Sequence, residues 1–372
     1  MSSMQVNGNL VQALGYLGIT SPAAERWRTY GSDYLGAQIA ADGPNGAVRL
    51  KFDKEKWRIQ ITPGEVDKVD FFGWLVNTEE DLQVAVERLG KTGVEVAWGS
   101  AELAAERSVN KLIQFTDPWG MPHEIAWGQL TDPEAFRPGR GMCGGFVTGS
   151  QGLGHVVLAI PDLEAGHAFF SGVLGFQLSD KIITPDGWIN ARFYHVNARH
   201  HTLALGQGPA GVVVFDHLML QVNSIDDVGW AYDNMEAFGL KETLTLGRHT
   251  NDQMVSFYHQ TPSLFNIEYG YAGHEITPEW VPRTYTDHSI WGHKLNPDVL
   301  KHPPGIVHKI ADSTPSGHPV QAYPAGHSTH IRPPVPRPFG RAVGAQRRRA
   351  GIVSPRRPAS SISSPAYASI RP

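Results

Sequence analysis

The chain repeats itself once along its length, and this duplication constrains its fold more than any other feature of the sequence. Residues 14–39 (LGYLGITSPAAERWRTYGSDYLGAQI) match residues 153–178 (LGHVVLAIPDLEAGHAFFSGVLGFQL), which lie 139 positions later. Two further pairs follow in the same order at offsets of 146 and 142: residues 69–93 with 215–239, and residues 123–128 with 265–270. Three matches in one order at a nearly constant distance predict two halves that share a fold.

Each half also contains smaller strand–helix–strand units. In the second half, Asp162 and Ser224 are expected to cap helices over 164–173 and 226–238, because such side chains accept hydrogen bonds from the first helical N–H groups. HLMLQV and MVSFYHQ alternate apolar and polar residues, which is typical of half-buried strands. The sequence therefore predicts an α+β fold of curved mixed sheets with helices packed outside.

Charge is spread unevenly along the chain. The 372 residues carry a net charge of −4, yet residues 331–372 contain nine arginines and no acid, so the first 330 residues carry −13. Such an acidic body is a poor general binder of nucleic acid, and we expect no nucleic-acid partner. Residues 301–372 are rich in proline, arginine and serine without periodicity, which predicts a disordered tail. The expected divisions are a first domain at 1–137, a second at 138–300 and this tail.

Other features exclude whole classes of protein. No window approaches the roughly 18 consecutive apolar residues of a membrane-spanning helix, so no membrane partner is expected. The first residues, MSSMQVNGNL, lack the basic and apolar segments of a secretory signal. Cys143 is the only cysteine, which excludes a disulfide framework and any multi-cysteine metal site. We therefore expect a cytoplasmic protein.

The two copies of the repeat allow an internal comparison. At three corresponding strand positions, the second half carries two imidazoles and a carboxylate: His155, His217 and Glu268. The first half offers no such set at the positions matched to them: Tyr16, Phe71 and Ala126. Two histidines and one carboxylate form the facial triad suited to non-haem Fe(II), and Mn(II) accepts the same ligands. We expect a metal site in the second half and a degenerate, metal-free first half.

Further polar side chains lie near these three along the sequence. A predicted strand between the first two ligands contains His200 and His201, and the segment before Glu268 contains His249, Asn251, Asp252 and Tyr258. A neutral histidine near pH 7 can accept and return a proton, and a tyrosine can hydrogen-bond a metal-bound oxygen. The histidines without such neighbours are interpreted as structural or surface residues: His123, His167, His195 and His259.

The segments around these residues resemble the type I extradiol ring-cleavage dioxygenases of the vicinal oxygen chelate superfamily. The resemblance extends over about residues 10–295 and rests on GHVVL, RHHTLAL, DHLML, LGRHTND with the following FY, IEYG, and WGHK at 291–294. It is greatest to enzymes that cleave 2,3-dihydroxybiphenyl and to their steroid-ring-cleaving relatives. The resemblance implies four βαβββ modules, which form two barrel-like curved sheets in two domains, with iron only in the second.

The resemblance also implies a role for each candidate residue. Fe(II) would be held by His155, His217 and Glu268, and His201 would handle the proton and the bound oxygen. His249 and Tyr258 would hydrogen-bond the substrate hydroxyls. The expected pocket residues are His200, Asn251, Asp252, Val157 and Phe193.

The implied reaction is the cleavage of a catechol by O₂ beside its two hydroxyls, which gives a 2-hydroxymuconic semialdehyde-type acid. A bicyclic catechol such as 2,3-dihydroxybiphenyl is preferred, because the expected pocket is mostly apolar. A homo-oligomer is expected from the resemblance alone. Two alternatives remain open: a glyoxalase-type metal-dependent isomerase or thiol transferase, and a metal-free protein that sequesters a small molecule.

Overall fold

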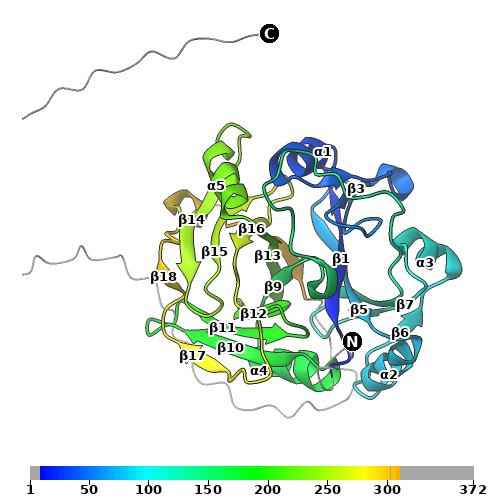
Figure 1. The fold of residues 1–372 in the computed structure, drawn as a ribbon. Coiled ribbons are helices and arrows are strands. Elements are labelled where there is room, and N and C mark those ends of the chain that lie inside the picture. The colour runs from blue at the N-terminus through cyan, green and yellow to red at the C-terminus, as the bar shows by residue number, and fades with distance from the viewer. Residues whose placement is uncertain (1–8, 302, 311–372) are drawn as a thin grey trace, which may run out of the picture. The chain divides into compact units, whose positions relative to one another are not determined.

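The computed structural model describes residues 9–301 and 303–310, whose strands form two mixed sheets (Figure 1). The first sheet has the order β2–β3–β4–β1–β5–β8–β7–β6, with the bounds β1 Ala13–Ser21, β2 Gln38–Ile39, β3 Val48–Lys51, β4 Ile59–Pro63, β5 Lys68–Val76, β6 Val96–Trp98, β7 Lys111–Thr116 and β8 Pro122–Trp127. The second has the order β17–β10–β11–β12–β9–β13–β16–β15–β14–β18, and β19 pairs with β13. Its bounds are β9 His155–Ile160, β10 Gln177–Ile183, β11 Asn190–His195, β12 Leu203–Gln207, β13 Val212–Val222, β14 Glu242–His249, β15 Val255–Gln260, β16 Asn266–Tyr271, β17 Arg283–Tyr285, β18 Ser289–Trp291 and β19 Ile306–Lys309.

Strand order repeats from one sheet to the other. β1 lies parallel to β4 and antiparallel to β5, and β9 lies in the same way between β12 and β13. Both central strands are apolar on nearly every residue, since each is covered on its two faces. The predicted duplication and the α+β class are therefore confirmed, and β17 and β18 extend the second sheet at its ends.

Helices lie outside the sheets, with the bounds α1 Arg26–Thr29, α2 Glu79–Gly90, α3 Ala101–Arg107, α4 Leu163–His167 and α5 Ile225–Asn234. Asp162 and Ser224 accept backbone N–H bonds at the starts of α4 and α5, which confirms both predicted caps. The first helical segment ends at Val173 as predicted, whereas the predicted end of the second helix is wrong. After α4 the chain continues as a π-helical segment, Ala168–Val173, and after α5 it leaves the helix for turns that end at Gly239, whose φ of 66° favours glycine.

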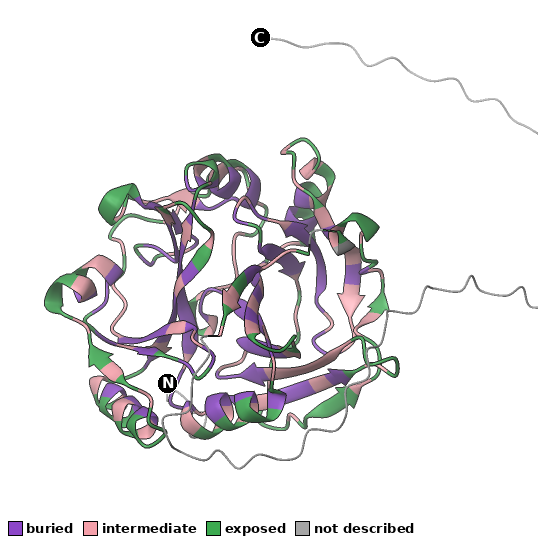
Figure 2. Cartoon of the chain, turned by 180° about the vertical axis from the view of Figure 1, so that it is seen from behind, coloured by how far each residue is buried: buried purple, intermediate pink, exposed green. Residues whose placement is uncertain are grey.

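A helical segment of each half packs against the other half. From the first half, Trp27 Nε1 donates to Ser263 Oγ at 2.8 Å, and Tyr30 Oη lies 2.8 Å from His259 Nε2. From the second half, Phe170 stacks on Trp119. The result is a single compact unit with shared apolar core residues (Figure 2). The expected boundary at 137 thus separates two sheets, but it does not separate two independent cores.

The expected tail from 301 onward is wrong at its start. β19 pairs antiparallel with Val212–Phe215 of β13, and its first residue, Ile306, is 4% exposed. Pro303, Pro304 and Gly305, directly before this short strand, have the composition of a loop, which is why the sequence did not predict it. The remainder of the predicted tail lies outside the described residues. Within the described part of the chain, no helix is long and apolar enough to cross a membrane.

Candidate metal centre and substrate pocket

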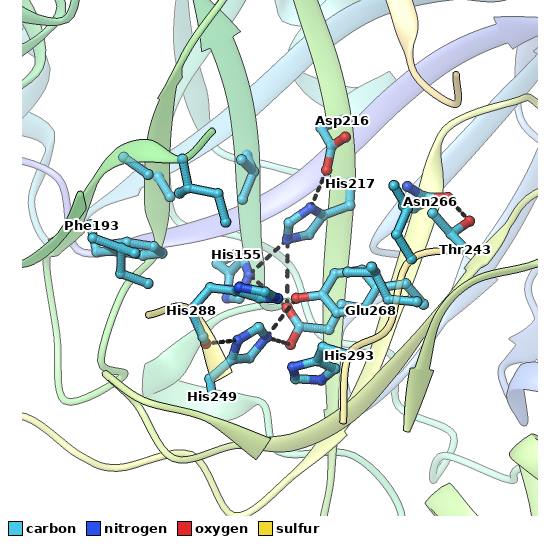
Figure 3. Close-up of a pocket in the computed structure, with 18 of the residues that line it drawn as sticks. His155, Phe193, Asp216, His217, Thr243, His249, Asn266, Glu268, His288 and His293 are labelled. Carbon is cyan, nitrogen blue, oxygen red and sulfur yellow. Dashed lines mark hydrogen bonds and ion pairs between the residues drawn. The ribbon is translucent and has the colours of Figure 1, made fainter. Parts of the chain in front are cut away.

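Three adjoining strands of the second sheet bring the predicted ligands together. Met219 of β13 lies in register with His155 of β9 on one side and with Glu268 of β16 on the other. His217 precedes Met219 by two residues, so the three predicted ligands share one face of the sheet. Figure 3 shows their side chains pointing toward one another.

The ligand atoms of these residues converge on one point. His155 Nε2 lies 3.3 Å from His217 Nε2 and 3.2 Å from Glu268 Oε2, and His217 Nε2 lies 3.5 Å from the same oxygen. All three side chains are buried. Two imidazole nitrogens and a carboxylate oxygen at such separations fit a divalent ion such as Fe(II) or Mn(II).

Charge in this cluster also favours a cation. Burial lowers the pKa of His155 to about 4, so this ring is neutral. Burial alone would raise the pKa of Glu268, but its hydrogen bonds with His155, His217 and His249 outweigh that effect and hold the pKa well below its usual value. Burial alone would lower the pKa of His217, but its hydrogen bonds with Asp216 and Glu268 raise it to about 9, so a protonated His217 balances the buried Glu268 carboxylate. A bound divalent cation would replace that proton and supply the positive charge that a buried carboxylate needs.

Groups around the ligands orient them, and the sequence analysis missed two of these groups. Asp216 Oδ2 accepts from His217 Nδ1 at 2.5 Å, and Ser256 Oγ donates to Glu268 Oε1 at 2.7 Å. A second hydrogen bond of this kind fixes the tautomer and direction of a ligating histidine. The Asp-His dipeptide at 216–217 is a signal that could have identified the first partner.

His249 and Tyr258 form a pair next to the ligands. His249 Nδ1 donates to the carbonyl oxygen of His288 at 2.9 Å, and its Nε2 lies 2.8 Å from Tyr258 Oη. The same nitrogen lies 3.3 Å from Glu268 Oε1. Burial raises the pKa of Tyr258 well above its usual value, so the phenol keeps its proton and remains a donor.

His201 and His200 differ in where their side chains lie. The ring of His201 packs over that of His155 with centroids 3.8 Å apart, and it lines the pocket. Burial lowers the pKa of His201 well below its usual value, so the ring is neutral. His200 is buried behind His201 and is not among the residues that line the pocket. The sequence analysis expected His200 to bind the substrate, whereas the structure places its side chain outside the pocket lining.

A pocket of about 580 Å³ opens beside the ligand cluster. Four residues predicted to line the pocket do so: Val157, Phe193, Asn251 and Asp252. Phe193 is seen beside the ligand cluster in Figure 3. The pocket's other apolar lining residues were missed, because they come from β10 to β12, from β14 and from the segment after β18: Ile182, Trp188, Ile189, Ala191, Ala204, Leu244, Leu295, Val299, Pro303 and Pro304. No periodic pattern marks such residues as neighbours, since their proximity depends on how distant segments pack.

Sheet register corrects one of the internal correspondences. In the first sheet, Gly73 takes the place of Met219 and lies opposite both Tyr16 and Glu124. Glu124, rather than Ala126, is therefore the counterpart of the third ligand. The similarity of HEIAWG to FNIEYG had shifted this strand by two residues.

A guanidinium group occupies the centre of the corresponding cluster in the first half. Arg107 Nε donates to both oxygens of Glu124 at 3.0 Å, and its CZ atom lies 4.0 Å from the ring centroid of Phe71. Tyr16 Oη donates to Glu124 Oε2 at 3.0 Å. The first half thus keeps a buried carboxylate at this position and neutralises it with an arginine from its own chain.

Comparisons with known proteins agree with this geometry. The Glyoxalase/Bleomycin resistance protein/Dioxygenase superfamily matches residues 152–269, and the family "Dihydroxybiphenyl dioxygenase BphC D1" matches residues 14–64. The biphenyl-2,3-diol 1,2-dioxygenase of Paraburkholderia xenovorans (strain LB400) is 43% identical over 288 residues, which cover 76% of this chain and 95% of the relative.

Two further relatives extend the comparison. The iron-dependent extradiol dioxygenase of Rhodococcus jostii (strain RHA1) is 38% identical over 77% of this chain and 98% of its own length. The crystal structure of BphC, a halotolerant catechol dioxygenase, is 41% identical with a TM-score of 0.77, and the match covers 80% of this chain and 99% of that one.

Fold and site together define a member of the vicinal oxygen chelate superfamily. Within that superfamily the chain belongs to the extradiol dioxygenase family, as its relatives of about 40% identity over nearly their whole length show. The resemblance stated from the sequence is confirmed, and these relatives do not favour the isomerase or the sequestering alternative.

Proposed function

We propose that this protein cleaves a catechol beside its two hydroxyl groups, with O₂ as the oxidant and Fe(II) held by His155, His217 and Glu268. The observation that carries the proposal is the convergence of these three ligand atoms within 3.5 Å on the wall of an apolar pocket. The name of the Rhodococcus jostii relative, an iron-dependent extradiol dioxygenase, supports iron as the metal. Bound Fe(II) would supply a Lewis-acidic, redox-active centre at which both reactants can meet.

The chain's own residues bind the catechol and move its protons. His201 is neutral and lines the pocket, so it can take a proton from a substrate hydroxyl. Tyr258 remains protonated and can donate a hydrogen bond to a substrate oxygen, and His249 holds the phenol in place. Asn251 and Asp252 lie on the pocket wall near these groups and restrict the orientation of the ring.

The pocket favours a catechol with a second ring. Its volume of about 580 Å³ and its largely apolar lining provide space beyond the hydroxyl-binding end. Relatives of this chain are named for biphenyl-2,3-diol, 3-methylcatechol and 1,2-dihydroxynaphthalene, which supports a substituted or bicyclic catechol as the substrate class.

The test is oxygen uptake together with the absorbance of the yellow ring-opened acid, measured on anaerobically purified protein reconstituted with Fe(II). With 2,3-dihydroxybiphenyl we expect one O₂ consumed per product formed. His155→Ala should lose iron and turnover, because it removes one ligand. Tyr16→Phe changes the corresponding position of the first half and should keep both.

The same assay separates the metals and the alternatives. Reconstitution with Mn(II) should give less turnover than reconstitution with Fe(II) if iron is the native metal. The proposal would be wrong if iron-loaded protein consumed no O₂ with dihydroxybiphenyl, dihydroxynaphthalene or methylcatechol.

We also propose that the chain acts as a homo-oligomer in the cytoplasm. Its family membership supports the first point, and its single, exposed Cys143 is compatible with a reducing compartment. Light scattering on the full chain tests the assembly, and a monomer at micromolar concentration would contradict it.

A further inference from the structure

A series of buried hydrogen bonds leads from β10 to His201. Asp180 Oδ2 lies 2.9 Å from His200 Nε2, and His200 Nδ1 lies 3.1 Å from His201 Nδ1. Asp180 is 0% exposed, His200 2% and His201 4%. Of the three, only His201 lines the pocket. Asp180 and His200 can therefore influence a bound substrate only through His201.

Neighbouring groups hold the first two members of this series in place. The backbone N–H of Arg283 donates to the other oxygen of Asp180 at 2.6 Å. The Ser179 hydroxyl donates to the carbonyl oxygen of His200, and Trp280 packs edge-on against the His200 ring with centroids 5.1 Å apart. The His200 ring thus has a defined orientation, with Nε2 toward Asp180 and Nδ1 toward His201.

The position of each proton follows from these contacts. A carboxylate has no proton to donate, so His200 Nε2 carries the hydrogen that lies between it and Asp180. A neutral imidazole has a single N–H, so His200 Nδ1 accepts and His201 Nδ1 donates. With its proton on Nδ1, His201 keeps the lone pair of Nε2 free on the side of the ring away from His200.

We propose that Asp180 and His200 are positioning residues, which hold His201 with its proton on Nδ1 and its Nε2 free to take a proton from the substrate. This inference rests on the proposed function, in which His201 is the proton acceptor. A residue that fixes the tautomer of a catalytic histidine contributes to turnover without touching the substrate.

The first half of the chain supports this reading by contrast. Strand register matches His201 to Trp57 and His200 to Lys56. Trp57 packs against Tyr16 with ring centroids 5.3 Å apart, as His201 packs against the first ligand, but Lys56 is exposed to solvent. The half that lacks the two histidine ligands also lacks the hydrogen-bonded series.

Asp180→Asn tests the proposal on the iron-loaded full chain. The amide oxygen is expected to keep the N–H of Arg283 and to turn its NH₂ toward His200, which moves the His200 proton to Nδ1 and reverses the tautomer of His201. We expect kcat to fall by roughly tenfold to a hundredfold. Iron content and the anaerobic Kd for the catechol should stay within about twofold of the wild type, because neither depends on this proton.

Asp117→Asn is the matched control. In the first half, Asp117 Oδ2 lies 3.2 Å from His123 Nε2, and Asp117 Oδ1 accepts backbone N–H bonds from Trp119 and Met121. The substitution therefore changes the same kind of carboxylate–histidine contact as Asp180→Asn, but in the half of the chain without the pocket. This variant should keep the wild-type kcat. A kcat for Asp180→Asn equal to that of the control would overturn the proposal.

Two substitutions of His200 test whether it holds the tautomer of His201, and they do so even if Asp180→Asn does not fold. In His200→Asn the amide oxygen replaces Nδ1 and still accepts from His201, so kcat should stay within about threefold of the wild type. In His200→Gln the polar end replaces Nε2 and leaves His201 without its acceptor, so kcat should fall as in Asp180→Asn. Equal kcat values for the two variants would contradict the proposed role.

The tautomer itself can be observed independently of turnover. Long-range ¹⁵N–¹H spectra of histidine-labelled protein loaded with diamagnetic Zn(II) distinguish Nδ1–H from Nε2–H rings, and His201→Asn assigns the signal. We expect Nδ1–H for His201, and Nε2–H would overturn the inference. If this tautomer is observed but the iron-loaded wild type does not cleave catechols, the proposed function fails while the positioning of His201 stands.

Discussion

Asp216 lies outside the proposed ligand set but holds the ring of one proposed ligand, His217, in place. Its carboxylate accepts from His217 Nδ1, which directs Nε2 toward His155 and Glu268. Asp216→Asn should weaken iron binding by about 10- to 100-fold, measured by competition with a chelator. Asp233→Asn, an exposed change on α5, should leave the affinity unchanged. Equal affinities in the two variants would contradict this role.

His259 makes folding sensitive to acid. It is fully buried on β15 against Tyr30, and burial lowers its pKa to about 3. The unfolded chain, with a histidine pKa near 6.5, binds a proton that the folded chain does not, so stability falls as pH drops from about 6.5 toward 3. The expected loss from this residue is about 2 kcal/mol at pH 5.

The variant His259→Gln should remove that loss. Urea unfolding at pH 7 and pH 5 measures the effect, and the difference between the two free energies of unfolding should be about 2 kcal/mol smaller in the variant. An unchanged difference would show that another group accounts for the acid sensitivity.

At the scale of elements, the guanidinium cluster links α3 to β8 in the first half. Arg107, at the end of α3, is 8% exposed and its partner Glu124 on β8 is 1% exposed. Arg107→Ala leaves a buried carboxylate without a cation, so we expect a loss of about 3–5 kcal/mol in the free energy of unfolding. Lys111→Ala removes an exposed ion pair with Glu79 and should cost less than about 1 kcal/mol. Similar losses in the two variants would mean that the buried pair is not stabilising.

At the scale of the whole molecule, the two halves depend on each other because a helical segment of each half packs against the other half. Trp27 and Tyr30 lie against the second half, and Phe170 lies against the first, so neither half buries its apolar surface alone. We expect a single cooperative thermal transition over the described region, with equal calorimetric and van't Hoff enthalpies. Two resolved transitions would show that the halves unfold independently.

The sequence by itself determined the features that depend on local pattern and on the duplication. Strand alternation, the caps at Asp162 and Ser224, and the repeated strand order could be predicted because each is encoded within a short segment. The sequence also identified His155, His217 and Glu268 as a set, since two imidazoles and a carboxylate on corresponding apolar strands stand out against the other copy.

Only the tertiary structure decided which residues are neighbours across segments. It placed Glu124, and not Ala126, beside Arg107, because strand register depends on pairing across the sheet rather than on sequence similarity. It turned His200 away from the pocket toward Asp180, and it brought Pro303 to the pocket wall through the pairing of β19 with β13. Such contacts join residues far apart in the chain, and their energies come from burial and hydrogen bonding that no local pattern records.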